Sequence, residues 1–162
     1  GVAMRVRVRG PQRGGGGQRV YLDKKNAGEG GEGATSREKK RSGTVEQLRN
    51  LLQLPGPLTR MEAYDISNTA GSDIVASMVV FVDGKPLKKD YKRFKLRDMV
   101  GQDDYGSMRQ VLTRRFTHYL QGDPGFSEPP DLLLIDGGEV HAQTAEAVLF
   151  ELGLSFPVYG CL

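Results

Sequence analysis

The chain has 162 residues, of which 38% are hydrophobic and 27% are charged, and its formal net charge is +3. No run of about 18 consecutive apolar residues occurs, which excludes a transmembrane helix. The single cysteine, Cys161, excludes a disulfide framework and a cysteine-rich zinc site. We therefore expect a protein of the reducing cytoplasm with no membrane partner.

Charge and glycine content divide the chain in two. Residues 1–60 carry 13 Lys or Arg against 5 Asp or Glu, whereas residues 61–162 carry 10 against 15. The first 43 residues also hold the runs GGGG and GEGGEG, and segments this polar bury too little surface to become ordered. We expect residues 1–43 to be a basic, poorly ordered tail, either a solvated linker or a contact for nucleic-acid phosphates. Residues 44–162 would form the folded domain.

The first half of this domain is predicted to contain one helix and three strands. Apolar residues at helical spacing predict a short helix over 44–54, which the Pro-Gly-Pro that follows would end. A β-branched run over 75–84 predicts a strand, and the Asp-Gly pair at its end is typical of a hairpin turn. With RMEAYDISN (60–68) before it and the alternating segment 85–98 after it, we expect a three-stranded antiparallel meander.

The second half alternates helices and strands. Two aspartates precede an amphipathic pattern that predicts a helix over 104–120. The apolar run 131–136 is typical of a buried central strand, and a helical pattern over 139–153 and the start of a strand at 156–160 follow it. The order β-β-β-α-β-α-β indicates an α/β fold with a mixed sheet. Because the pattern stops inside a strand, we expect a fragment truncated at its C-terminus.

Two aspartates are candidate metal ligands, since Asp65 interrupts an apolar strand and Asp136 ends one. Acidic side chains are rarely fully buried unless they are paired or bind a metal. If the two strands are neighbours, the carboxylates converge as hard oxygen ligands suited to Mg²⁺ or Mn²⁺, and such a site could support phosphodiester hydrolysis. The alternatives are that Asp136 only forms a turn, that hydrogen bonds satisfy Asp65, and that Asp104 caps its helix instead of adding a ligand or an acid–base group.

Cations gather on the third strand of the meander and on the next helix. We expect a set of them to lie near phosphates: Lys88, Lys89, Lys92, Arg93, Arg114 and Arg115. The alternative for the strand is a solvated edge that its lysines protect from aggregation. We expect His118 and His141 to be surface residues, with a role as metal ligand as the alternative for His141. No Ser-His-Asp constellation, P-loop or dinucleotide fingerprint occurs.

A succession of motifs resembles one known family. YDISN, VASMVVF, DGKP, DDYGSM and LLIDGG follow one another through residues 60–160. In this order they closely resemble the C-terminal nuclease half of the bacterial UvrC family, which belongs to the excinuclease ABC system. The segment PQRGGGGQRVYLDKKNA resembles, more loosely, the stretch that leads into that domain. The resemblance implies an RNase H-like fold, which agrees with the order of elements.

The resemblance also implies a function, namely nucleotide excision repair with a cut on the 5′ side of a DNA lesion. The metal-binding aspartates of the family fall on Asp65 and Asp136, and an additional essential aspartate falls on Asp104. The implied cofactor is Mg²⁺ or Mn²⁺. The implied partners are UvrB, UvrA and damaged double-stranded DNA.

Several features that the resemblance would imply have no counterpart in this sequence. The catalytic histidine of the family lies beyond Leu162, and neither His118 nor His141 matches it. The 3′-cutting domain, the UvrB-binding segment and the helix-hairpin-helix pair are also missing from this sequence. We therefore expect a domain that is weak or inactive alone. The alternatives are a non-catalytic nucleic-acid-binding module with an RNase H-like fold and a purely structural or interaction domain.

Overall fold

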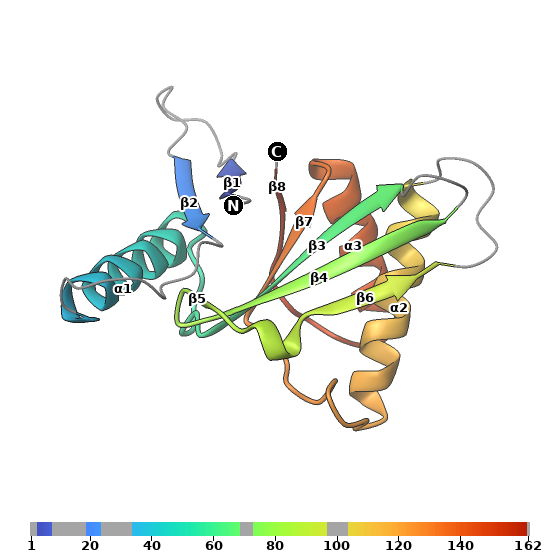
Figure 1. The fold of residues 1–162 in the computed structure, drawn as a ribbon. Helices are drawn as coiled ribbons and strands as arrows, with labels where there is room; N and C mark the ends of the chain where they lie inside the picture. Colours follow the sequence, from blue (N-terminus) through green and yellow to red (C-terminus); the bar gives the residue numbers. More distant parts are fainter. Residues whose placement is uncertain (1–2, 8–18, 24–33, 69–72, 97–103, 162) are drawn as a thin grey trace.

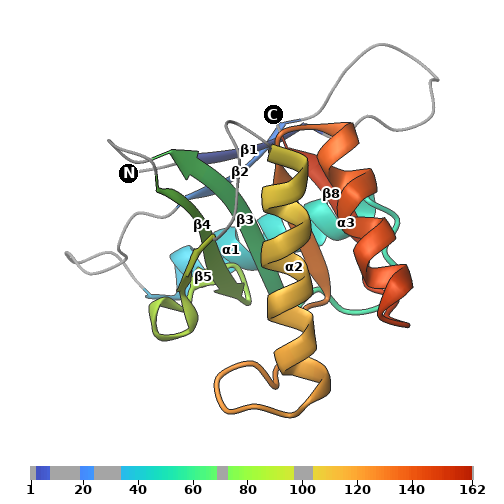
Figure 2. The same ribbon diagram turned by 90° about the vertical axis from the view of Figure 1, so that its right-hand side faces the viewer.

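The computed structural model describes residues 3–7, 19–23, 34–68, 73–96 and 104–161. The elements are β1 (Ala3–Arg7), β2 (Arg19–Asp23), α1 (Ala34–Leu51), β3 (Arg60–Asn68), β4 (Ile74–Val82), β5 (Lys85–Pro86), the 3₁₀ turn η1 (Lys88–Asp90), β6 (Lys92–Lys95), α2 (Asp104–Leu120), β7 (Leu132–Asp136), α3 (Glu139–Glu151) and β8 (Val158–Cys161). A mixed sheet forms the middle layer, with α2 and α3 on one face and α1 on the other (Figure 1, Figure 2). None of the described helices is long and apolar enough to cross a membrane.

The sheet confirms the predicted meander and its parallel extension. Strand β4 pairs antiparallel with β3 on one side and with β5 and β6 on the other. Strand β7 pairs in parallel with β3, and β8 pairs in parallel with β7. The strand order is therefore β5-β4-β3-β7-β8, with β6 also beside β4. The α/β fold with a mixed sheet, predicted from the order of elements, is correct.

Helix α1 begins at Ala34, well before the predicted start at residue 44. The added turns are polar, with Glu, Lys and Arg that are good helix formers but give no apolar periodicity. Within them the Thr44 hydroxyl donates to the Lys40 carbonyl at 2.9 Å. Strands β1 and β2, which pair antiparallel, also lie in the segment expected to be poorly ordered. The domain boundary at residue 44 stays a prediction.

Two apolar clusters sandwich the sheet. Residues of β3 alternate between them: Met61 and Ala63 pack with Leu48 of α1, whereas Tyr64 packs with α2 and α3. All four residues from Leu132 to Ile135 of β7 are fully buried, as predicted for a central strand covered on both faces. The alternation assigns each residue of β3 and β7 to one face of the sheet.

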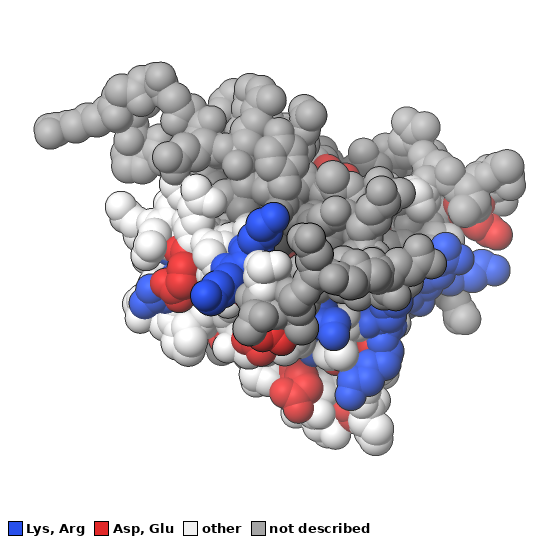
Figure 3. Space-filling model, turned by 60° about the vertical axis from the view of Figure 1, so that its left-hand side comes forward, with Lys and Arg blue, Asp and Glu red and all other residues white. Residues whose placement is uncertain are grey.

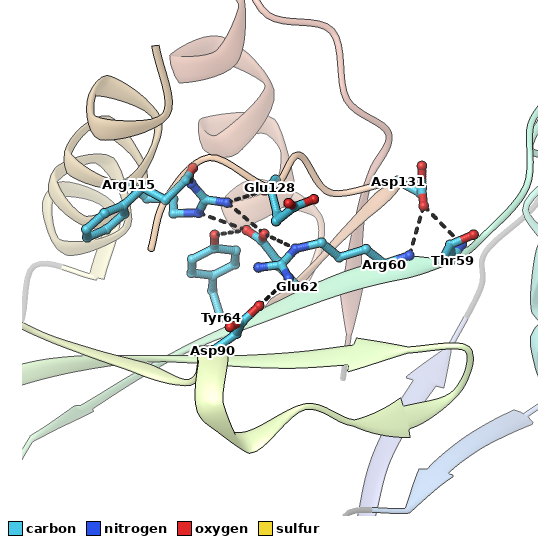
Figure 4. A network of polar contacts seen from close by, with 9 residues as sticks. Thr59, Arg60, Glu62, Tyr64, Asp90, Arg115, Glu128 and Asp131 are labelled. Atoms are coloured by element: carbon cyan, nitrogen blue, oxygen red, sulfur yellow. Dashed lines mark hydrogen bonds and ion pairs between the residues drawn. The ribbon is translucent and has the colours of Figure 1, made fainter. Parts of the chain in front are cut away.

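On the α2 face, a buried carboxylate anchors β3. Glu62 has no exposed surface, and its two oxygens accept four hydrogen bonds (Figure 4). The donors are Arg60 Nε at 3.0 Å, the Tyr64 hydroxyl at 2.6 Å, and Arg115 through Nε at 3.1 Å and Nη2 at 2.8 Å. Burial, and then the charge of Glu62, raise the pKa of Tyr64 well above its usual value, so the phenol keeps the proton that it donates.

The same guanidinium groups tie distant segments to this carboxylate. Arg115 of α2 also donates to the carbonyls of Phe126 at 2.7 Å and Glu128 at 2.8 Å. Arg60 donates from Nη1 to Asp90 of η1 at 2.7 Å. No buried side-chain nitrogen or oxygen lacks a partner in the part of the chain that the structure describes. The network therefore holds β3, η1, α2 and the loop after α2 together, and burial of its charges is compensated.

Replacing Arg115 with Met should leave the Glu62 carboxylate buried without its bidentate partner. Breaking a buried ion pair in this way costs about 3–5 kcal/mol, to be measured as a lower midpoint of urea unfolding. Arg114→Met, one residue earlier in the same helix, is the matched control. Arg114 is only partly buried, and its contacts with the Lys95 carbonyl and Gln110 should be worth less than about 1 kcal/mol. Equal losses in the two variants would contradict the anchoring role of the network.

Candidate metal centre and nucleic-acid surface

The register of β3 and β7 places the two predicted metal ligands side by side. The last paired positions are Tyr64 and Ile135, so the next residues on the two parallel strands are Asp65 and Asp136. Neighbouring strands lie about 4.8 Å apart. Both aspartates share the α1 face with Ala63, and both are exposed. Two exposed carboxylates therefore stand together where the parallel pairing of β3 with β7 ends.

The carboxylates belong to a row that crosses the sheet. Asp65 pairs with Ser77 of β4, and Ser77 pairs with Arg93 of β6. On the other side, Asp136 pairs with Cys161 of β8. Because directly paired residues project to the same face, the row from Arg93 through the two aspartates to Cys161 lies on the α1 side of the sheet.

The turn after Asp136 is tightly built. Gly137 and Gly138 have φ values of 127° and 88°, which side chains rarely adopt. A Cβ atom on Gly160 of β8 would lie 2.6 Å from the Gly138 carbonyl oxygen, so the absence of a side chain at Gly160 lets the turn approach β8 closely. The Gly137 N–H donates to the Cys161 carbonyl at 3.2 Å. These contacts fix the backbone that follows the Asp136 carboxylate.

The other candidate ligands are placed differently. Asp104 opens α2, and its side chain lies outside the described part of the structure. His118 Nδ1 lies 2.6 Å from Asp123 Oδ2, and His141 Nδ1 lies 2.8 Å from the Gly137 carbonyl oxygen. Among the described residues, no three His, Cys, Asp or Glu side chains form a group that could hold a metal ion. The described donor set at this site is the carboxylate pair.

Two of the six cations predicted to contact phosphates, Arg115 and Lys92, are buried or half-buried. Arg115 is fully buried in the Glu62 network, which corrects its prediction as a phosphate ligand. Its place in α2 four residues after Val111, on the apolar face, was the signal that sequence reasoning missed. Lys92 is half-buried, with Nζ 4.4 Å from the centre of the Phe126 ring. Arg114 is half-exposed and donates to the Lys95 carbonyl at 3.0 Å.

Three of the predicted cations are exposed on η1 and β6, namely Lys88, Lys89 and Arg93. Lys85 and Lys95, on the flanking positions of β5 and β6, are exposed as well. Lys and Arg side chains form a band along one side of the molecule in Figure 3. A band of this kind is what a phosphate backbone would meet.

Burial sets the chemistry of the thiol beside the carboxylates. Cys161 is a free, buried cysteine. Burial, and then the charge of Asp136, raise the pKa of its thiol to about 12. The thiolate is the reactive form of cysteine, so a thiol with a pKa this high is a poor nucleophile at neutral pH.

The fold and the site together define a class, an RNase H-like α/β domain with paired carboxylates on two adjacent parallel strands. Residues 49–162 match the family described as "UvrC RNAse H endonuclease domain". The chain belongs to this family, and the resemblance and the fold expected from the sequence are both confirmed.

Named relatives agree with this assignment. The chain is 50% identical over 129 residues to the UvrABC system protein C of Lachnospira eligens, covering 76% of this chain and 21% of the relative. It is 50% identical over 128 residues to the UvrABC system protein C of Caldanaerobacter subterraneus, covering 72% and 21%. The chain therefore spans about a fifth of the length of these relatives. The crystal structure of Ciona intestinalis Endonuclease V in complex with a 24mer DNA is similar with a TM-score of 0.45 and 14% identity, covering 77% of this chain and 57% of that one.

The raised pKa of Cys161 gives stability a dependence on pH. In the unfolded chain the thiol ionises near its ordinary pKa of 9.0, whereas in the fold it stays protonated to about 12. The free energy of unfolding should therefore fall as pH rises above about 9, and this group should have no effect below that pH. The measurement is urea unfolding at pH 8 and pH 10.5 for the protein and for Cys161→Ala. An equal loss in both would mean that the thiol does not contribute.

Proposed function

We propose that this chain is a metal-dependent endonuclease domain of nucleotide excision repair, which makes the incision on the 5′ side of a DNA lesion. Asp65 and Asp136 would hold a Mg²⁺ or Mn²⁺ ion. The observation that carries the proposal is the parallel register that brings these two exposed carboxylates side by side on adjacent strands, where the pairing of β3 with β7 ends. Membership of the UvrC endonuclease family supports the reaction class.

The residues present fit a hard divalent cation. Carboxylate oxygens are the ligands that Mg²⁺ and Mn²⁺ prefer, and Mg²⁺ commonly binds through one or two carboxylates while keeping several waters. A bound cation of this type stabilises charge on phosphate oxygens and lowers the pKa of a bound water. Exposure of both carboxylates leaves room for a phosphate, and the rigid strands on which they stand hold their separation.

The remaining assignments extend this proposal. Asp104, at the start of α2, would support the metal or position the attacking water. Lys88, Lys89 and Arg93 would contact phosphates. Damaged double-stranded DNA is the proposed substrate, with UvrB and UvrA as protein partners in the cytoplasm. The names of the relatives, UvrABC system protein C, support these partners.

Activity of this chain by itself should be weak. Hydrolysis needs a group that can accept a proton from water. The His118 ring is paired with Asp123, and the His141 ring contacts the Gly137 carbonyl beyond the end of β7. A non-catalytic nucleic-acid-binding module with this fold is the second candidate, because the described donor set holds two carboxylates rather than three.

Binding of Mn²⁺ tests the site directly. In a titration followed by electron paramagnetic resonance, the protein should bind Mn²⁺ saturably, and Asp65→Asn combined with Asp136→Asn should weaken binding by roughly tenfold or more because the charged ligands are lost. Asp83→Asn, at the exposed hairpin between β4 and β5, is the matched control and should bind as the unaltered protein does. Binding that survives in the double variant would reject the carboxylate site.

Incision then separates the two candidates. With a lesion-containing duplex and the UvrA and UvrB proteins, a nuclease domain should show 5′ cutting that is weak but depends on Mn²⁺ and on both aspartates. Duplex binding that needs neither metal nor aspartates, without any cutting, would favour the non-catalytic module.

A further inference from the structure

Strand β6 presents two different faces. Phe94 is buried in the cluster beneath α2, and Lys92 lies on the same side, against the Phe126 ring. Arg93 and Lys95 alternate with them and are exposed. The sequence places four consecutive polar or aromatic residues here, but the pleat sends only the odd-numbered pair to the α1 side of the sheet.

The α1 side is also the side of the carboxylates. The pairing runs from Arg93 to Ser77 and from Ser77 to Asp65, so Arg93 stands in the same cross-strand row as the proposed metal ligands. Two strand spacings, about 10 Å, separate Arg93 from Asp65 along this row. In this row of described residues, the small, half-exposed side chain of Ser77 stands between Arg93 and Asp65.

Arg93 is available for a ligand. Among the described residues its guanidinium has no hydrogen-bond or ion-pair partner. Lys95, one row further along the strand, lies 3.9 Å from the Asp73 carboxylate. A guanidinium on an exposed edge strand can protect that edge from aggregation, but protection of the edge does not require alignment with two carboxylates. A planar fork of donors is well suited to a phosphate group.

We infer that Arg93 is a phosphate-positioning residue for the proposed nuclease site, and that a DNA backbone crosses the sheet over β7, β3, β4 and β6. The inference rests on the proposed function for its substrate. It adds the direction in which the DNA backbone crosses the site, and it selects Arg93 from the cations of the band. A phosphate held by Arg93 would place a neighbouring stretch of the same backbone above Asp65 and Asp136.

The first test measures binding of a fluorescein-labelled 20-base-pair duplex by anisotropy in EDTA, between 50 and 200 mM salt. Arg93→Gln should reduce the slope of log affinity against log salt by about 0.9, the value for one lost phosphate contact. Lys92→Gln removes the same charge from the adjacent residue on the opposite face and should leave the slope unchanged. Arg93→Lys should restore the slope, because the charge returns. Equal slopes for Arg93→Gln and the unaltered protein, or equal reductions in Arg93→Gln and Lys92→Gln, would overturn the inference.

The second test asks whether the bound backbone passes over the carboxylates. In EDTA, Asp65→Asn should raise duplex affinity by several-fold because one negative charge beneath the phosphates is removed, and Asp83→Asn should not. No gain from Asp65→Asn would overturn the proposed path. Both tests are made without metal and without cutting. Failure of Mn²⁺ binding would therefore reject the nuclease proposal alone, whereas an unaltered salt slope would reject the role of Arg93 alone.

Discussion

The parallel pairing of β3 with β7 is the constraint on which the site depends. Side chains alternate along a strand, so a slip of one residue would turn Asp65 to the opposite face of the sheet and separate it from Asp136. The register is held from both sides, because Leu132 to Ile135 of β7 are buried against α1 on one face and against α2 and α3 on the other. Packing of the buried part of the strand thus determines the separation of the carboxylates.

The two faces of β3 carry carboxylates with different roles. On the α2 face the Glu62 carboxylate is saturated by four hydrogen bonds and holds a helix and a loop in place. Three residues later and on the opposite face, Asp65 remains exposed. Strand β3 therefore carries two carboxylates in different surroundings. Glu62 is buried and needs hydrogen-bond partners to offset the cost of burial, whereas Asp65 is exposed. A side chain of the same charge takes its role from the face on which the pleat places it.

The sequence contains enough information for much of this arrangement. An aspartate within one strand and an aspartate at the end of another indicate that Asp65 and Asp136 converge if the two strands are adjacent, and the strands do pair. The helical spacing of Arg115 and the alternation of Lys92 with Phe94 carry equally clear signals, but charge alone suggested a different role for both. The start of α1 could not be predicted, because its first turns are polar and lack apolar periodicity. The side chain of Asp104 lies outside the described residues, so its part in the site stays a prediction.

The buried network has a consequence for how DNA approaches the protein. Arg60 and Arg115 carry two positive charges, and Glu62 and Asp90 carry two negative ones, so the network is electrically neutral. Long-range attraction depends on the summed charge of the molecule. This network therefore adds almost nothing to the field that a distant duplex experiences, and the field comes mainly from surface residues screened by salt. Exchange of the whole network for apolar residues would alter stability while leaving the rate of DNA encounter nearly constant, whereas loss of single surface lysines would slow encounter in a fold that stays equally stable.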